Sequence, residues 1–553
     1  MFELRYSSVG KLSTMQTAIL ALALALAAPA QDPHEAKVDA LFASWNEKTP
    51  GVAVALSRGG KLLHVGCYGL ADVEKGGSIT KTTRFYAASV SKQFVAACAV
   101  MLEAEGKLKW SDSLQTHLTE FTAVGGGISI GDLVHHRSGL RDYFELGRFA
   151  KLDFDRDQSA DDVVALLAKQ RDLNFAPGSD YLYCNSGYFL LGVIIGRLTK
   201  SSLREYATKA LFEPHGMKNS VFKDSSDHDV PQAAVGHQRR GKRYVPHRTR
   251  FAMVGSGGLF ISVMDLLRWL ESMQAKGASD SFVRRMLTAP KLDGSQRRSP
   301  RTGDYAAGLR VGRYRGVRVV QHAGSSFGFR AHSAFFPDQG LCVALLGNAA
   351  NIDASRLAMA TAAVFLGDRL QPPAKAPAGK QPIDAPALLV DDDSGDLARL
   401  APQRDRMRLV TLSWQIDLVS NKGDKLRSIG TALPVAGEVL RAANGSVSGL
   451  KLQVANENAR RFTALPPFTM PARTWKDYEG QYHSVELDRT IQVRRRKAAL
   501  AFDGVAHQPL TRDLMFTIRG GLLEFERDDA DRITGVRVST RRARRMLFTR
   551  RRP

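Results

Sequence analysis

The spacing of apolar residues in the first two thirds of the chain predicts both helices and strands. Apolar residues recur at helical spacing from Phe94 to Leu102, directly after Ser89, and Gly106 marks the expected end of that helix. Similar patterns predict helices near 35–45, 188–195 and 266–270. The longest of these segments carry few polar positions, which is typical of helices buried on most sides.

Strand patterns occupy the two ends of the same region. Residues 51–56 and 61–66 flank the glycine turn at 58–60, which predicts a hairpin. Residues 331–336 and 341–346 flank Pro337-Asp338-Gln339-Gly340 and predict a second hairpin. Hairpins at both ends with helices between them favour an α+β domain, built as an antiparallel sheet flanked by helices.

Beyond a proline-rich stretch the pattern becomes almost entirely short strands. Evenly spaced short strands with turns between them predict small antiparallel β-barrels, one or two in number. The stretch at 459–463 resembles the stretch at 544–549, which suggests two barrels of related sequence. The expected organisation is a signal peptide at 1–30, a catalytic domain at 31–370, a linker at 371–386, and barrels at 387–467 and 472–553.

The net charge of +23 is high for a chain of 553 residues, and much of it lies in arginine clusters near the C-terminus. Such a field attracts anionic partners, such as a cell-envelope polymer. A solvated, arginine-rich surface without a partner explains the same composition, and the sequence favours this second interpretation.

The N-terminus predicts export. Positive charge at Arg5 and Lys11 precedes an apolar run at 18–28, and Ala28-Pro29-Ala30 has the form of a signal-peptidase site. Met15 is an alternative start. No later stretch is long and apolar enough to predict a membrane span, so we expect a periplasmic or extracellular protein without a transmembrane domain after signal removal. The four cysteines lack metal-ligand spacing, and neither a metal nor another cofactor is expected.

Ser89 and Lys92 are the first candidates for chemistry. Three positions apart, they share one face of a helix, where a desolvated lysine can act as the base for a serine hydroxyl. Four other Ser-x-x-Lys matches occur, but none opens into a long apolar helix. Tyr183 stands in the chain's only Tyr-x-Asn, before a buried helix, where a phenol can shuttle protons. His322-Ala323-Gly324 ends a strand, where glycine allows close backbone approach.

Together these motifs resemble, in order and spacing, the serine β-lactamase-related family. That family includes class C β-lactamases, DD-peptidases, D-aminopeptidases and certain esterases. The resemblance extends over 38–366 and includes His135-His136-Arg137-Ser138-Gly139-Leu140, whose adjacent histidines we interpret as structural. A β-lactamase/penicillin-binding-protein-like domain followed by barrels is similar to the D-stereospecific aminopeptidases.

The resemblance implies a role for each motif residue. Ser89 would be the acylated nucleophile, and its N–H with that of Ser325 would form the oxyanion hole. Lys92 and Tyr183 would share general acid and base work, and Asn185 would bind the substrate amide and position Lys92. The residues implied to bind substrate are Asn185, His322, Gly324 and Ser325.

His322 stands where many members carry lysine. A mostly neutral histidine supplies less positive charge than lysine does. The expected substrate is therefore a small peptide of D-amino acids or a small ester, and not a β-lactam. The leading interpretation is therefore an exported serine hydrolase that acts through an acyl-enzyme. The alternative is a non-catalytic envelope protein that binds peptidoglycan peptides, with a basic C-terminal region that binds a polyanion.

Overall fold

The structure, a computed structural model, describes residues 33–154, 158–277, 279–290, 304–372, 383, 385–393, 396–403, 406–411, 415–429, 434–455, 458–517 and 521–551. The expected signal peptide and most of the expected linker lie outside the described residues. Within the described part of the chain, no helix has the length and apolar character needed to cross a membrane.

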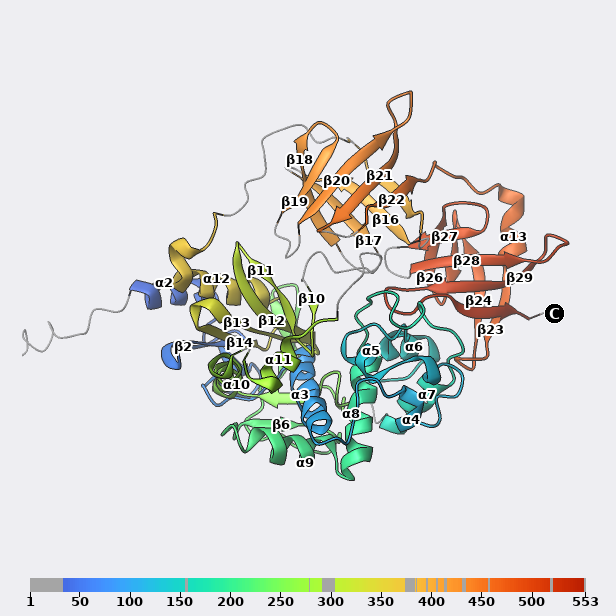
Figure 1. The fold of residues 1–553 in the computed structure, drawn as a ribbon. Helices are drawn as coiled ribbons and strands as arrows, with labels where there is room; N and C mark the ends of the chain where they lie inside the picture. Colours follow the sequence, from blue (N-terminus) through green and yellow to red (C-terminus); the bar gives the residue numbers. More distant parts are fainter. Residues whose placement is uncertain are drawn as a thin grey trace, which may run out of the picture.

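A seven-stranded antiparallel sheet forms the centre of the first domain (Figure 1). Both expected hairpins are present in it, and each is closed by a turn with glycines at positive φ, at Gly59, Gly60 and Gly340. The strands in spatial order are β10 Asp304–Tyr305, β11 Arg310–Tyr314, β12 Val317–Ser326, β13 Phe329–Phe336, β14 Leu341–Gly347, β1 Val52–Arg58 and β2 Lys61–Tyr68.

Strand β1 shows how the sheet separates two helical layers. Val52, Val54 and Leu56 pack in the core with α2 Pro33–Phe42 and α12 Ala354–Leu366. The alternate residues, Ala53 and Ala55, face the larger core with α3 Ser91–Ala104, α8 Asn185–Thr199 and α10 Val263–Lys276. Every residue from 52 to 56 is buried, because helices cover both faces of the strand. The sequence of the strand is therefore apolar throughout and does not alternate between apolar and polar residues.

Shorter elements complete this domain. The helices are α4 Leu114–His117, α5 Ile130–Val134, α6 Tyr143–Ala150, α7 Ala160–Ala168, α9 Leu203–Ala207 and α11 Ser281–Leu287, with helical turns at η1 Ala88–Val90, η2 Gly125–Gly127, η3 Thr208–Phe212, η4 Pro337–Gln339 and η5 Gly367–Arg369. Minor sheets pair β3 Leu70–Asp72 with β4 Gly76–Ser78, β7 Gly236–Arg240 with β8 Arg243–His247, and β9 Leu259–Ile261 with both β5 Phe85–Tyr86 and β6 Ser220–Phe222.

The C-terminal part forms two closed antiparallel barrels of eight strands each. The prediction of a β-lactamase-like α+β domain followed by barrels is confirmed, and the similar stretches are the last strands of the two barrels. The first barrel contains β15 Ala387–Asp391, β16 Leu397–Pro402, β17 Met407–Thr411, β18 Gln415–Lys422, β19 Lys425–Ile429, β20 Val435–Arg441, β21 Val447–Val454 and β22 Arg460–Ala464. The second contains β23 Gly480–Ser484, β24 Arg489–Arg496, β25 Ala499–Phe502, β26 Val505–Pro509, β27 Leu514–Thr517, β28 Gly521–Arg527, β29 Ile533–Ser539 and β30 Met546–Arg550, after η6 Ala472–Thr474 and α13 Trp475–Tyr478.

The second barrel packs against the helical part of the first domain, beside α5, α6 and α7 (Figure 1). Phe149 of α6 contacts Phe502 and Phe548, and their side chains belong to one continuous core. The loop between β29 and β30, Thr540–Arg545, reaches the first domain and is called the arginine loop below. It contributes Arg541, Arg542 and Arg544 to the cavity that contains Ser89.

Candidate active site

The cavity lies where η1, β12, the start of α8 and the arginine loop meet, and it measures about 990 Å³. Six of the seven residues predicted from the sequence line it: Ser89, Tyr183, Asn185, His322, Gly324 and Ser325. The seventh, Lys92, lies beneath the floor and contacts Ser89. The structure therefore brings all seven together from three separate segments of the chain.

Ser89 occupies a 3₁₀ turn that leads into α3, and not the helix itself. The preceding residue, Ala88, has φ 48°, a value uncommon for a residue with a side chain. Its carbonyl accepts a 2.6 Å hydrogen bond from the Ser91 hydroxyl, which helps to hold the turn. Pairing of β5 with β9 then places Ser256 next to the first turn of α3. This turn presents the Ser89 hydroxyl to the cavity above Lys92.

Lys92 is completely buried, and three oxygens surround its amine. Nζ lies 3.2 Å from Ser89 Oγ, 2.9 Å from Asn185 Oδ1 and 2.6 Å from the Ser256 carbonyl oxygen. Burial lowers the pKa of Lys92 well below its ordinary value, and the charge of Arg542 lowers that pKa further, while Asp142 raises it. A neutral amine can donate its two N–H groups to Asn185 and Ser256. Its lone pair is then left for the Ser89 proton.

Asp142 fixes the orientation of Asn185. One carboxylate oxygen of Asp142 accepts hydrogen bonds from the Asn185 backbone N–H at 2.7 Å and from Asn185 Nδ2 at 2.9 Å. With Nδ2 committed to Asp142, Oδ1 must face Lys92. Asp142 also caps α6 by accepting from the Phe144 N–H. Asp142 was not predicted from the sequence, where its only local signal is the capping pattern that begins α6.

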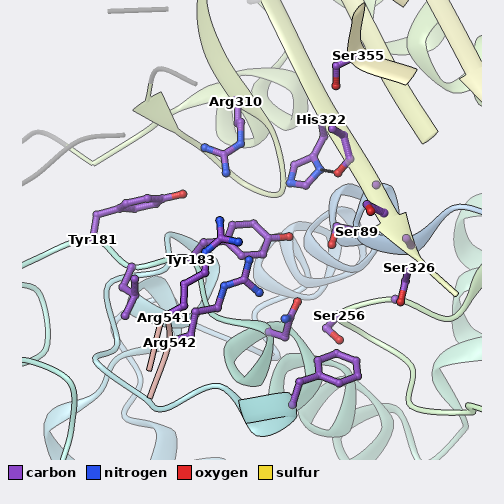
Figure 2. Close-up of a pocket in the computed structure, with 18 of the residues that line it drawn as sticks. Ser89, Tyr181, Tyr183, Ser256, Arg310, His322, Ser326, Ser355, Arg541 and Arg542 are labelled. Atoms are coloured by element: carbon purple, nitrogen blue, oxygen red, sulfur yellow. Dashed lines mark hydrogen bonds between the residues drawn. The ribbon is translucent and has the colours of Figure 1, made fainter. Parts of the chain in front are cut away.

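The Tyr183 hydroxyl is buried and points toward Ser89 (Figure 2). Burial raises the pKa of Tyr183, whereas the Ser89 hydroxyl and the guanidinium groups of Arg542 and Arg310 lower it. Lys92 Nζ lies 5.0 Å from the centre of the Tyr183 ring. The phenol is therefore protonated at neutral pH and is placed to exchange a proton with either the Ser89 oxygen or a group attached to the substrate.

His322 is neutral and held by two hydrogen bonds. Its Nδ1–H donates to the Ala323 carbonyl at 2.8 Å, so Nε2 accepts from the Tyr305 hydroxyl at 3.1 Å. Burial lowers the pKa of His322 well below its ordinary value, and the charges of Arg310 and Lys92 act in the same direction. The neutral histidine expected from the sequence is thus the form that this environment favours.

Gly324 lets β12 pass directly over the turn that carries the serine. A Cβ atom at position 324 would lie 2.2 Å from the Ala87 carbonyl oxygen, so no side chain fits there. The next residue, Ser325, is exposed at the cavity edge. Gly257 packs equally closely: a Cβ there would lie 2.4 Å from the Tyr86 hydroxyl.

His136 lies against Tyr183, with ring centres 4.2 Å apart. Its Nδ1 accepts the Cys184 N–H at 3.2 Å, and burial lowers its pKa well below the ordinary value. His135 contacts the Tyr305 carbonyl oxygen instead, at 3.2 Å. The two neighbours therefore point to different partners, as expected for structural histidines. Among the residues that the structure describes, no group of His, Cys, Asp and Glu is arranged to hold a metal.

Comparison with known proteins identifies the family of this chain. Residues 35–367 match the family described as Beta-lactamase. A D-aminopeptidase of Brucella anthropi is 27% identical over 532 residues, which cover 92% of this chain and 96% of the relative. A D-aminopeptidase of Brucella melitensis biotype 2 is 26% identical over 543 residues, with 91% and 96% covered.

Solved structures show the same fold. An octameric penicillin-binding protein homologue from Pyrococcus abyssi superposes with a TM-score of 0.54 at 22% identity, covering 77% of this chain and 99% of that one. A D-stereospecific amidohydrolase from Streptomyces sp. gives a TM-score of 0.50 at 21% identity, with 60% and 99% covered. On the family match and the D-aminopeptidase relatives, this chain belongs to the Beta-lactamase family and is a serine hydrolase.

Proposed function

We propose that the enzyme cleaves an amide or ester in two steps through an acyl-enzyme on Ser89. Ser89 Oγ attacks the substrate carbonyl while its proton passes to Lys92 Nζ. The tetrahedral intermediate collapses, and Tyr183 donates a proton to the leaving nitrogen or oxygen as it takes one from Lys92. Water then attacks the ester, gives its proton to the same pair of bases, and Ser89 leaves as the hydroxyl.

One observation carries this proposal: the Lys92 amine is desolvated, lies 3.2 Å from Ser89 Oγ, and has acceptors for both remaining N–H groups. A lysine in that setting is a base and not merely a buried cation. The neighbouring N–H groups of Ser89 and Ser325 are the donors that we propose for the oxyanion.

For the substrate we propose a peptide of D-amino acids or a small ester. The D-aminopeptidase relatives support the D-configuration, and their similarity extends over nearly the whole chain. The neutral His322 offers no positive charge to a β-lactam carboxylate, so we expect β-lactams to be poor substrates. We also propose export, because the sequence 1–30 has the features of a signal peptide.

Active-site labelling tests the mechanism. Treating the protein with a fluorophosphonate and digesting it should place one adduct on the peptide that contains Ser89, and D-alanyl peptides or phenyl esters should be hydrolysed. Ser89→Ala should lose both the adduct and the turnover. An enzyme that hydrolyses neither substrate and gains no adduct on Ser89 would disprove the proposed mechanism.

A further inference from the structure

One end of the second barrel carries a group of exposed cations. η6 and α13 lie against the end of β24, where the guanidinium carbon of Arg495 is 5.4 Å from the centre of the Trp475 ring. The exposed basic residues of these elements and of the turn after β24 are called the basic patch: Arg473, Lys476, Arg494, Arg495, Arg496 and Lys497.

The basic patch and the contacts with the first domain lie at opposite ends of the barrel. β24 begins at Arg489, whose guanidinium donates to the carbonyl oxygen of Phe149 in α6, and it ends at Arg496. At about 3.3 Å per residue, the two ends of this strand are about 23 Å apart. β30 runs in the same direction as β24, because both pair antiparallel with β23. The arginine loop, which precedes β30, is therefore at the end remote from the patch, and α13 lies on the outer side of the barrel (Figure 1).

The patch differs from the neighbouring turns in its ion pairing. Three arginines of the other turns at this end are paired with aspartates: Arg512 with Asp531, Arg527 with Asp513, and Arg532 with Asp528. Within the described part of the chain, none of the six basic side chains of the patch forms an ion pair. The acidic residues beside them are Asp477, which is exposed, and Glu479, whose carboxylate accepts the Arg495 N–H at 2.8 Å. Six positive charges against these two negative charges leave a net charge of +4.

The local structure presents this charge on a protruding surface. Arg494 and Arg496 alternate with Arg495 along β24, so their side chains point to the same side of the strand. Arg495 lies over Trp475, and its Nε donates to the Lys497 carbonyl oxygen at 2.9 Å, which holds the guanidinium at the tip of the hairpin. Lys497 itself has φ 56° in the turn that joins β24 to β25. The charge is thus carried by a hairpin tip and the short helix beside it.

This shape favours a planar anionic partner over a nucleic acid. Single-stranded nucleic acids bind through bases that stack on exposed aromatic rings. The aromatic side chains of α13, Trp475 and Tyr478, are buried, so the patch offers no ring for a base to stack on. The headgroups of anionic phospholipids form a plane of negative charge, which several separate lysine and arginine side chains can reach at once.

We propose that the basic patch binds the surface of a membrane that contains anionic phospholipids. The second barrel then has two binding ends: one docks on the first domain beside the cavity, and the other holds the enzyme at the membrane. This inference does not rest on the acyl-enzyme mechanism, because it involves no residue of the candidate active site.

Vesicle sedimentation tests the patch. The full chain is sedimented with vesicles of phosphatidylglycerol and phosphatidylcholine in equal parts, and with vesicles of phosphatidylcholine alone, which report binding that does not depend on charge. Binding to the anionic vesicles should be the stronger in about 0.1 M NaCl and should lose this excess in about 1 M NaCl, where the screening length is about 3 Å. Each Lys or Arg near an anionic surface strengthens binding about fivefold, so Arg494→Gln with Arg496→Gln should lower the partition coefficient about 25-fold. Arg473→Gln with Lys476→Gln, on the second element of the patch, should have the same effect.

A matched control separates the patch from the net charge of the chain. Arg239→Gln with Arg240→Gln removes the same charge from two adjacent exposed arginines of β7 in the first domain, and it should leave the partition coefficient unchanged. The urea unfolding midpoint of each double variant should stay at the wild-type value, since all the substituted side chains are exposed.

Three outcomes overturn the proposal. Equal binding of the wild type to charged and neutral vesicles excludes a charge-dependent membrane site. An equal loss of binding in the control and in the patch variants shows that net charge, and not the patch, attracts the protein. Retention on immobilised polyphosphate without binding to vesicles assigns the patch to a soluble polyanion instead. Labelling of Ser89 enters none of these measurements, so failure of the proposed mechanism leaves the membrane site to be judged separately.

Discussion

Lys92→Met is expected to slow acylation of Ser89 by about 10³- to 10⁴-fold, at the upper end of what a positioned base contributes. Methionine has nearly the volume of lysine and keeps the buried space filled, but it cannot take the Ser89 proton. The rate of fluorophosphonate labelling measures acylation directly, and kcat/KM for a phenyl ester measures it in turnover. Lys169→Met, an exposed position after α7, is the matched control and should keep the wild-type rate. A Lys92 variant that acylates at the wild-type rate would require a different base.

The pH dependence of the wild type gives a second, independent expectation. Only the neutral amine of Lys92 can accept the Ser89 proton, so kcat/KM should rise as pH passes upward through the Lys92 pKa and then level off. Burial is the main cause that lowers this pKa and the charge of Arg542 is the next. The rise in kcat/KM should therefore occur at a pH well below the ordinary pKa of a lysine side chain.

Removing the charge of Arg542 should shift this profile. In Arg542→Gln the second cause of the lowered pKa is absent, so the pKa of Lys92 increases and the rise in kcat/KM moves to higher pH. A neutral ester such as 3-acetoxybenzamide is the right substrate, because it carries no charge for the guanidinium of Arg542 to bind. If the pH dependence of kcat/KM in Arg542→Gln is the same as in the wild type, the charge of Arg542 does not lower the pKa of Lys92.

The sequence predicted the parts of the site that depend on short-range patterns. Ser89 and Lys92 lie together because they are three residues apart, Ser89 in a 3₁₀ turn and Lys92 in the first turn of the strongly apolar helix that follows it. Tyr183 and His322 were found by their motifs and their order along the chain, and the cavity contains both. The hairpins were predicted because strand periodicity and turn residues are local signals.

The contacts that complete the site could not be predicted in this way. Ser256 accepts from Lys92 across 164 positions of sequence, and its carbonyl is a backbone group that no residue type signals. The Asp142 carboxylate reaches Asn185 across 43 positions. Arg541 and Arg542 belong to a charge cluster that resembles a solvated surface, and only the docking of the second barrel turns them into the cavity. Their position at the cavity depends on tertiary packing, about which a single sequence carries little information.

Arg141 is buried between the first domain and the second barrel and forms hydrogen bonds to both. Its guanidinium donates to Glu486 Oε2 at 2.7 Å and Gln170 Oε1 at 2.9 Å, and to the carbonyl oxygens of Arg544 and Arg545 at 2.9 and 3.2 Å. Glu486 lies on the barrel and is itself mostly buried, so the pair joins the two domains in a region with little access to water. The carbonyl contacts hold the base of the arginine loop.

Arg141→Ala is therefore expected to lower the free energy of unfolding by about 3–5 kcal/mol, because it leaves Glu486 buried without its partner. The control Arg148→Ala removes a half-exposed arginine paired with Glu145, and it should cost less than about 1 kcal/mol. Urea unfolding of both variants measures the difference.

Replacing both partners, as Arg141→Met with Glu486→Met, should recover much of the lost free energy of unfolding, since neither charge of the pair then remains. An Arg141→Ala protein as stable as the control would mean that the barrel docks without this ion pair.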